Sequence, residues 1–425
     1  MKPKLFPITA LLALAGTLGV SYVMGQAPAA PVAPASGAAT AAPAITTVPG
    51  MPPVVDPRNV YSETASTRMS PVVKDHLERI YVPNLRGNDV YVIDPATMKV
   101  VDKIKVGYSP QHVVPSWDLK TLWVANNAER RPDGSLTPID PVTGKAGKAV
   151  MVDDPYNMYF TPDGKSAIIV AEARKRLDFR DAQTMAMQYS IDTPNCAGIN
   201  HADFSMDGRY AVFTCEFDGT VAKVDLVERK VIGYLKLTMP QMRFKEGSGT
   251  KNEPPVLEVC TAKKGMPQDI RISPDGKRFY IADMHADGVH IIDGESLKQV
   301  GFIQAALGTH GLYPSRDGKL LYVASRGTHK IHGKRGGPGA VTVIDFATDK
   351  IVARWTVPGG GSPDMGNVSA DGKWLWLSGR YDDEVYRFDT SSGAVQKVKA
   401  GAEPHGLTVW PQPGRYSLGH TGNLR

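Results

Sequence analysis

The chain has 425 residues and a formal net charge of +6 at pH 7, with 49 Lys and Arg against 43 Asp and Glu. Its basic residues are scattered and form no block interleaved with aromatic residues, which argues against nucleic-acid binding. The length is enough for one large β domain with an extensive core.

The N-terminus has the pattern of an export signal. Basic residues at positions 2 and 4 precede an apolar stretch over residues 8–24, and small residues follow Gln26. This pattern predicts a signal peptide over residues 1–26 and a periplasmic or secreted protein. The apolar stretch is close to the shortest length that spans a membrane, so an uncleaved anchor is the alternative, and only that alternative predicts membrane contact. Residues 27–55 are rich in Ala and Pro and are predicted to form a disordered linker before a domain over residues 56–425.

A repeat of hydrophobic-x-Asp runs through the rest of the chain. Seven strand-like segments end in this way, at Asp94, Asp140, Asp192, Asp225, Asp293, Asp345 and Asp389. Most intervals are about forty to fifty residues, which is typical of repeated units made of short strands, as in the blades of a β-propeller.

A second repeat of Asp-Gly turns supports the first. The turns lie at residues 163–164, 207–208, 275–276, 317–318 and 371–372, and a hydrophobic strand follows each one. Asp followed by Gly is typical of a tight hairpin turn. Each unit is therefore predicted to contain strand A, an Asp-Gly turn, strand B, a loop, strand C ending in Asp, and strand D.

These units resemble the YVTN family of propeller repeats. Tyr81-Val82-Pro83-Asn84, followed by residues 89–94 and 103–107, is similar to one family repeat, and the resemblance extends over about residues 77–411. It implies an all-β, seven-bladed propeller, but family members include scaffolds, binding proteins and enzyme subunits. The first unit lacks strand A and residues 405–411 supply only strand A. The last blade is therefore expected to combine N-terminal strands B to D with a C-terminal strand A, which removes an exposed sheet edge. The tail over residues 415–425 has no assigned place.

The chain has three cysteines, Cys196, Cys215 and Cys260. An odd number in an exported protein leaves at least one thiol unpaired within the chain. Cys196 and Cys260 lie in long connections that lead into A strands, and a disulfide between them is one possibility. Cys215 is expected to be a small buried residue.

Polar residues are predicted to surround one end of the central channel. Strand A is innermost, and the residues aligned at the starts of the A strands are Gln111, Tyr156, Asn200, Gln268, His310, Asp364 and His405, with His112, His201 and Asp269 directly after three of them. Such a ring is expected either to bind a ligand or to organise water in the channel.

The histidines in this ring suggest a metal site. Imidazole is a common ligand for copper and zinc, so His112, His201, His310 and His405 with Asp364 are candidate ligands. The spacing supplies no independent support, because these residues belong to different blades. The sequence has neither a Cys-x-x-Cys-His heme motif nor a phosphate loop, so it gives no indication of heme or nucleotide binding.

The B-to-C loops are expected on the same face and carry several basic residues. Arg326 and Arg380 are candidates to bind a small polar or anionic ligand, or an exported partner protein with an acidic surface. Two loops, residues 236–266 and 326–340, are longer than the rest and are candidate lids or binding loops.

These patterns predict an exported, non-catalytic propeller that holds copper, zinc or a small polar ligand at the His-rich channel mouth. Two alternatives remain. The first is an enzyme or a subunit of a periplasmic oxidoreductase, similar to the propeller subunits of amine dehydrogenases, or a lyase. The second is a scaffold for proteins or cell-surface polymers.

Overall fold

The computed structural model describes residues 44–129, 131–249 and 255–415, all of which belong to one compact unit, Ala42–Arg425. The predicted signal peptide, most of the predicted linker and the tail beyond residue 415 lie outside the described residues. No helix in the described part of the chain is long and apolar enough to cross a membrane.

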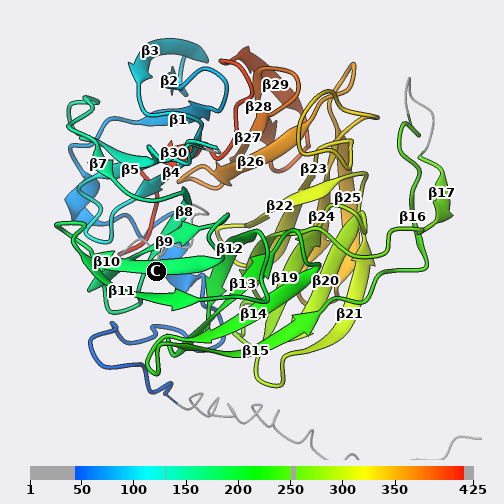
Figure 1. Cartoon of the computed structure of the whole chain (residues 1–425). Coiled ribbons are helices and arrows are strands. Elements are labelled where there is room, and N and C mark those ends of the chain that lie inside the picture. The colour runs from blue at the N-terminus through cyan, green and yellow to red at the C-terminus, as the bar shows by residue number, and fades with distance from the viewer. Residues whose placement is uncertain (1–43, 130, 250–254, 416–425) are drawn as a thin grey trace, which may run out of the picture. The chain divides into compact units, whose positions relative to one another are not determined.

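Seven four-stranded antiparallel sheets are arranged around a common centre, as Figure 1 shows. The predicted all-β, seven-bladed propeller is therefore confirmed. In each of six blades, strands A to D follow one another in the sequence and lie side by side in the same order. This arrangement follows from the short connections, which favour pairing between consecutive strands.

The strands of the first three blades have the following bounds. Blade 1 contains β30 (Thr408–Trp410), β1 (Arg79–Asn84), β2 (Asp89–Asp94) and β3 (Lys99–Lys105). Blade 2 contains β4 (Pro110–Pro115), β5 (Leu122–Asn126), β6 (Ser135–Ile139) and β7 (Val150–Met151). Blade 3 contains β8 (Pro155–Phe160), β9 (Ser166–Ala171), β10 (Arg176–Asp181) and β11 (Met187–Asp192).

The remaining blades complete the ring. Blade 4 contains β12 (Ile199–Phe204), β13 (Tyr210–Cys215), β14 (Thr220–Asp225) and β15 (Lys230–Lys236). Blade 5 contains β18 (Pro267–Ile272), β19 (Arg278–Asp283), β20 (Gly288–Asp293) and β21 (Lys298–Gln304). Blade 6 contains β22 (Thr309–Pro314), β23 (Leu320–Ser325), β24 (Ala340–Asp345) and β25 (Lys350–Thr356). Blade 7 contains β26 (Pro363–Val368), β27 (Trp374–Gly379), β28 (Glu384–Asp389) and β29 (Val395–Lys399).

The predicted closure of the ring is confirmed in blade 1. The C-terminal strand β30 pairs antiparallel with β1, with Trp410 opposite Arg79 and Thr408 opposite Tyr81. The two ends of the domain thus share one sheet. This pairing satisfies backbone groups of β1 that would otherwise form an open edge.

The A-to-B turns have the chemistry that the sequence predicts. In blade 3, the Asp163 carboxylate accepts hydrogen bonds from the Thr161 hydroxyl at 2.6 Å and from the Lys165 backbone N–H at 3.1 Å. Gly164 follows with φ of +71°, a conformation that other residues adopt only with strain. These turns place all A strands in the same direction, so their first residues meet at one end of the channel.

The opposite end of the propeller is covered by residues 44–73, which include two short 3₁₀ helices, η1 (Ser62–Thr64) and η2 (Pro71–Val73). Backbone N–H groups of Val48 and Val60 donate to Asp207 and Pro274 in the A-to-B turns of blades 4 and 5, at 2.9 and 2.8 Å. Ile45 and Val54 also pack against a core cluster. The described part of the predicted linker, residues 44–55, therefore contacts the propeller, because its few large apolar side chains find places between the blades.

The long insertion after blade 4 contains a separate hairpin of β16 (Met242–Phe244) and β17 (Leu257–Val259). The hairpin contacts the other long loop, residues 326–340, because the Thr328 hydroxyl donates to Glu246 at 3.3 Å and Arg243 contacts His329 at 2.9 Å. The two loops that the sequence identified as unusual are thus one connected structure.

The disulfide joins Cys196 to Cys215, so the predicted pairing of Cys196 with Cys260 is wrong. Cys196 precedes β12, and Cys215 ends the adjacent strand β13, where it pairs with Ile199. Sheet pairing therefore brings these two residues together. Cys260 follows β17 of the inserted hairpin and has a free thiol.

Candidate functional site

The first residues of the A strands converge as predicted. The imidazole rings of His112, His201, His310 and His405 follow one another with centroid separations of 5.3 Å, 6.5 Å and 5.8 Å, and 4.9 Å separates His405 from His112. The Tyr156 ring lies 5.4 Å from His112 and 5.8 Å from His201. The sequence thus identified the members of a real cluster at the channel mouth, which we call the histidine cluster.

A β-bulge at the start of six A strands helps to form this cluster. The register between strands A and B shifts within the first residues of β4, β8, β12, β18, β22 and β26. A bulge changes the direction of the side chains beside it. Consecutive residues such as Asn200 and His201 are therefore both buried near the channel instead of pointing to opposite faces of the sheet.

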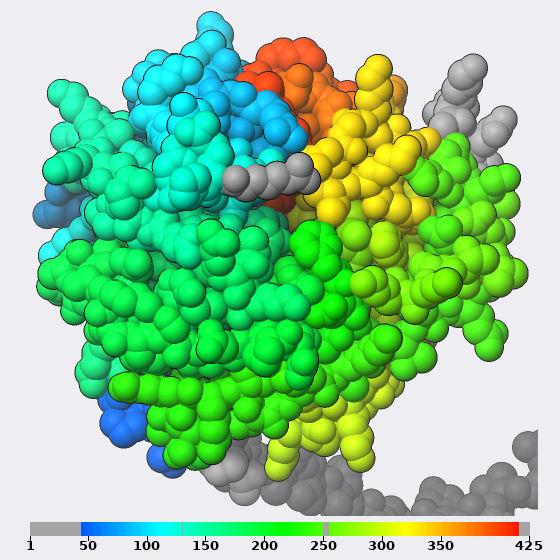
Figure 2. All heavy atoms as spheres, in the orientation of Figure 1, coloured from blue at the N-terminus to red at the C-terminus, as the bar shows by residue number. Residues whose placement is uncertain are grey.

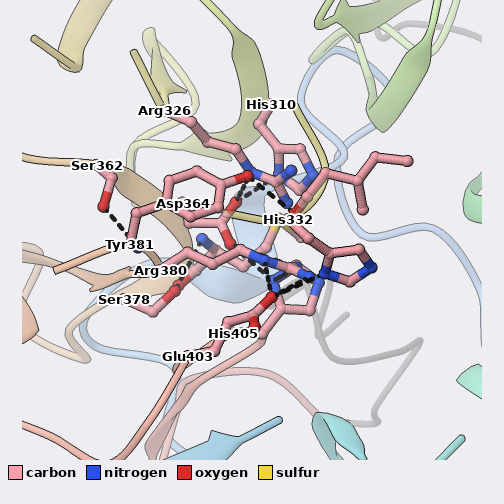
Figure 3. Close-up of polar contacts among 12 residues, drawn as sticks. His310, Arg326, His332, Ser362, Asp364, Ser378, Arg380, Tyr381, Glu403 and His405 are labelled. Carbon is pink, nitrogen blue, oxygen red and sulfur yellow. Dashed lines mark hydrogen bonds and ion pairs between the residues drawn. The ribbon is translucent and has the colours of Figure 1, made fainter. Parts of the chain in front are cut away.

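Asp364 is the centre of the charged part of the site (Figure 3). Its two carboxylate oxygens lie 2.8 Å from Nδ1 of His310 and 2.7 Å from Nδ1 of His405. The Nε–H of Arg326 donates to the same carboxylate at 2.7 Å. Asp364 is fully buried, and burial alone would raise its pKa, but the charge of Arg326 and the contacts with His310 and His405 hold the pKa well below its usual range.

Both imidazoles bound to Asp364 are neutral at physiological pH. Burial and the charge of Arg326 lower the pKa of His310 to about 3. Burial lowers the pKa of His405 to about 4, against the opposing effect of Asp364. A neutral ring that donates through Nδ1 carries its acceptor lone pair on Nε2. In His405 this atom faces the Tyr156 hydroxyl at 3.5 Å.

A second carboxylate holds the other buried arginine. Arg380 donates through Nε and Nη2 to Glu403 at 3.1 and 3.0 Å, while its Nη1 lies 3.1 Å from His405. Arg86 and His332 also contact Glu403, each at 3.1 Å. Burial alone would raise the pKa of Glu403, but these cationic and hydrogen-bonding neighbours lower it to about 2. Arg326 and Arg380 are only 2% and 4% exposed, so both predicted anion-binding arginines belong to the buried site.

Two glutamates occupy the other side of the mouth. Glu172 directly follows β9 and Glu216 directly follows β13, and their carboxyl groups lie in hydrogen-bonding contact. Burial and the neighbouring Glu216 raise the pKa of Glu172 well above its usual range. The amide nitrogen of Asn200 donates to Glu216 at 3.0 Å. Burial and both glutamates raise the pKa of the nearby Tyr156, and Arg380 and Arg326 oppose this rise.

Three other predicted site residues have mainly structural contacts. The Asp269 carboxylate pairs with Arg271 at 2.7 and 2.9 Å and accepts from the backbone N–H of Leu312, although it approaches His201 to 4.0 Å. The Gln268 amide donates to the Met266 carbonyl at 3.3 Å. Gln111 is buried at the start of β4, and its backbone carbonyl accepts from Gly406.

Residues 326–340 lie beside and partly over the mouth. The Tyr381 hydroxyl contacts the Ile331 carbonyl at 3.0 Å, and His332 reaches across to Glu403. Figure 2 shows a narrow hollow at the centre of this face, with the yellow loop on one side. We call residues 326–340 the lid loop.

The described residues contain no group of three His, Cys, Asp or Glu side chains positioned to hold a metal ion. Nδ1 of His310 and of His405 lie 2.8 and 2.7 Å from the Asp364 carboxylate, so Nε2 is the nitrogen that each ring could offer to a ligand. Glu403 was not predicted because it lies before β30, outside the A-strand starts and the B-to-C loops that the repeat alignment compares. Glu172 and Glu216 could have been predicted as site residues, because they lie in B-to-C loops, as Arg326 and Arg380 do.

Comparisons with known proteins support the fold. A model of the YNCE-like β-propeller family matches residues 37–185. The uncharacterized protein YncE of Salmonella typhi is 22% identical over 307 residues, which cover 69% of this chain and 75% of that protein. Together with the seven sheets, these matches confirm the predicted resemblance to seven-bladed repeat propellers.

Two solved structures illustrate the range of proteins with this fold. The periplasmic gluconolactonase PpgL of Pseudomonas aeruginosa is 18% identical in sequence to this chain and superposes with a TM-score of 0.55. The alignment covers 78% of this chain and 98% of PpgL. A chain of Kuenenia stuttgartiensis hydrazine synthase is 19% identical, covers 78% of this chain and 94% of its own, and has a TM-score of 0.52. At these identities the likeness establishes only the fold.

Proposed function

We propose that the protein is an exported propeller that binds a small organic anion at the histidine cluster. The observation that carries the proposal is the set of hydrogen-bond donors around Asp364. Arg326 is buried and uses Nε to bind Asp364, while its Nη1 contacts the weak acceptor Sδ of Met284 at 3.5 Å. A carboxylate is a much better partner for the outer guanidinium nitrogens than a thioether.

The neutral histidines favour a ligand that also carries hydroxyl groups. Nε2 of His310 and of His405 are acceptors if Nδ1 of each ring donates to Asp364. The site therefore combines guanidinium donors for an anionic group with imidazole acceptors and the Tyr156 hydroxyl for polar groups. A hydroxy acid provides both kinds of partner, with its carboxylate on Arg326 and its hydroxyls on the imidazoles.

Export is supported by two observations. The N-terminal sequence has the pattern of a signal peptide, and the Cys196–Cys215 disulfide is the kind of crosslink that persists in oxidising compartments. The structural likeness to a periplasmic gluconolactonase agrees with this location. N-terminal sequencing of the protein from a periplasmic extract is expected to find a mature N-terminus between Gln26 and about residue 35, whereas an intact Met1 in the membrane fraction would contradict the proposal.

The binding proposal is tested by thermal unfolding of the exported chain in the presence of gluconate or sorbitol. The two molecules differ mainly in the carboxylate, so gluconate is expected to raise the melting temperature and sorbitol is not. Arg326→Lys keeps the charge but not the planar fork, and it should weaken gluconate binding about tenfold. Arg174→Gln removes a half-exposed arginine that pairs with Asp153 at 3.1 Å and serves as the control. Equal shifts with sorbitol, or no shift with either molecule, would overturn the proposal.

Copper or zinc at the histidine cluster is a second candidate. The spacing of the four rings favours it, because consecutive centroids lie 4.9 to 6.5 Å apart. Binding would use Nε2 of His310 and of His405, since Nδ1 of each ring lies against the Asp364 carboxylate, as is common for metal-ligating imidazoles. Titration of Cu²⁺ or Zn²⁺ into the chain and into His310→Ala/His405→Ala tests this candidate. Stoichiometric binding that the double variant loses would support it, and equal heats would remove it.

A catalytic role is the alternative that the His310–Asp364 pair favours. A neutral imidazole oriented by a carboxylate is suited to act as a general base. Hydrolysis of D-glucono-δ-lactone by the wild-type chain but not by His310→Gln would support an enzyme. Binding of gluconate without turnover would support the non-catalytic function.

A further inference from the structure

Two carboxyl groups are in contact at the channel mouth, and the anion-binding site proposed around Asp364 and Arg326 does not explain this contact. Glu172 and Glu216 belong to the B-to-C loops of blades 3 and 4, and their carboxyl groups are close enough to hydrogen bond. Glu216 is only 5% exposed. Among the described residues, neither carboxylate forms an ion pair with Lys or Arg. Two negative charges in this position repel strongly unless a proton or a cation lies between them.

The loop that carries Glu172 is fixed by its surroundings. Asp154 accepts a hydrogen bond from the backbone N–H of Ala173 at 2.6 Å and another from the Asn127 amide at 2.9 Å. Ala173 directly follows Glu172, so Asp154 fixes the backbone beside it. The approach of the two glutamates is thus built into the fold of the loop.

Asn200 supplies an independent indication of a ligand. Its side chain is fully buried, and its amide nitrogen donates to Glu216 at 3.0 Å. That contact identifies which end of the amide is nitrogen, because only the nitrogen can donate to a carboxylate. The amide oxygen, attached to the same carbon, is buried without a hydrogen-bond partner. A buried acceptor in this state costs free energy unless a donor or a cation satisfies it.

We propose that Glu172, Glu216 and Asn200 form a binding site for a hard divalent cation, with Ca²⁺ as the best match. The donors are two carboxyl groups and one amide oxygen, the ligand types that Ca²⁺ prefers, and the set contains neither sulfur nor nitrogen ligands. Ca²⁺ completes its coordination with water, which the partial exposure of Glu172 permits. This site is separate from the anion site on Asp364 and does not depend on it.

The proposal is tested with Ca²⁺ as the probe and the full exported chain. After treatment with EDTA and its removal, CaCl₂ is expected to raise the melting temperature in a saturable way, because a ligand that binds only the native state stabilises it. Glu172→Gln and Glu216→Gln should each raise the Kd for Ca²⁺ at least tenfold. Glu228→Gln, which changes an exposed carboxylate 3.9 Å from Lys230, should retain the wild-type Kd.

Several outcomes would decide the question. If the pair only shares a proton, Ca²⁺ will not change the melting temperature of any variant, and the proposal fails. An equal Ca²⁺ effect in wild type and in Glu172→Gln would also overturn it. Glu172 lies in a loop and is half-buried, so this variant tests the site even if Glu216→Gln does not fold. Gluconate titrations in EDTA keep the two proposals apart, because Glu172→Gln should retain the gluconate effect that Arg326→Lys weakens.

Discussion

The two sides of the channel mouth handle buried charge in opposite ways. On the side of blades 6 and 7, each carboxylate has cationic partners, since Asp364 contacts Arg326 and Glu403 contacts Arg380. On the side of blades 3 and 4, Glu172 and Glu216 contact each other. Arginines of the chain neutralise the carboxylates on the first side, whereas the two glutamates on the second side need a positive charge that the described part of the chain does not supply. This difference predicts that mutations on the two sides change stability with opposite signs.

The largest effect is expected from Asp364→Asn. The substitution preserves the shape of the side chain but removes the charge that compensates Arg326 and binds two imidazoles. Loss of one partner of a buried ion pair typically costs about 3–5 kcal/mol. The free energy of unfolding, measured in urea, should fall by about this amount. The matched control is Asp371→Asn in an exposed turn, where a loss below about 1 kcal/mol is expected. Equal effects at both positions would show that the Asp364 network contributes no special stability.

The next effect is a loss of stability in mild acid. The pKa values of His310 and His405 are about 3 and about 4 in the folded protein, below the usual value near 6.5 in the unfolded chain. Between the folded-state and unfolded-state pKa values, the unfolded chain binds more protons than the folded protein. The free energy of unfolding therefore falls as the pH decreases from about 6.5 toward 4. Each imidazole contributes a loss of at most about 2 kcal/mol between pH 6.5 and pH 5.

The contribution of these two residues is isolated by comparing wild type with His310→Gln/His405→Gln in urea at pH 7 and pH 5. The double variant is expected to be less stable at pH 7 but to lose less free energy of unfolding on acidification. An identical pH dependence in the two proteins would mean that the imidazoles titrate normally.

Glu172→Gln should have a smaller effect of the opposite sign. In EDTA at pH 8, Gln removes the cost of placing the Glu172 charge beside Glu216 or of keeping the group protonated there, and the free energy of unfolding is expected to rise by about 1 kcal/mol. The carboxylates of the other side provide the contrast, because Glu403→Gln should destabilise the protein under the same conditions. A destabilised Glu172→Gln protein in EDTA would show that the two glutamates are already compensated.

The smallest effect concerns the lid loop. Tyr381→Phe removes the hydroxyl that contacts the Lys330 and Ile331 carbonyls, and its cost in global stability should stay below about 1 kcal/mol. Hydrogen exchange measured by mass spectrometry should nevertheless become faster in residues 326–340, because local opening depends on few contacts. Unchanged exchange in this segment would show that other contacts hold the loop.

The repeat explains how much of this site was predictable. Alignment of the A strands identified His112, His201, His310, His405 and Asp364, and the loop positions identified Arg326 and Arg380, because propeller geometry converts equal repeat positions into spatial neighbours. The pairing within the cluster was not predictable. It depends on β-bulges that redirect side chains. It also depends on contacts such as that of Arg380 with Glu403, which join segments at positions that the repeat does not align. The cysteine pairing failed for a similar reason, since sheet register brings Cys215, and not Cys260, beside Cys196.

Isothermal titration of gluconate into the purified chain at pH 7 tests the central claim, that the Asp364 side of the mouth binds a small organic anion. We expect saturable binding to one site per chain, about tenfold weaker binding in Arg326→Lys, and unchanged binding in Arg174→Gln. An absence of binding heat in the wild-type chain, or equal affinities in all three proteins, would contradict the account.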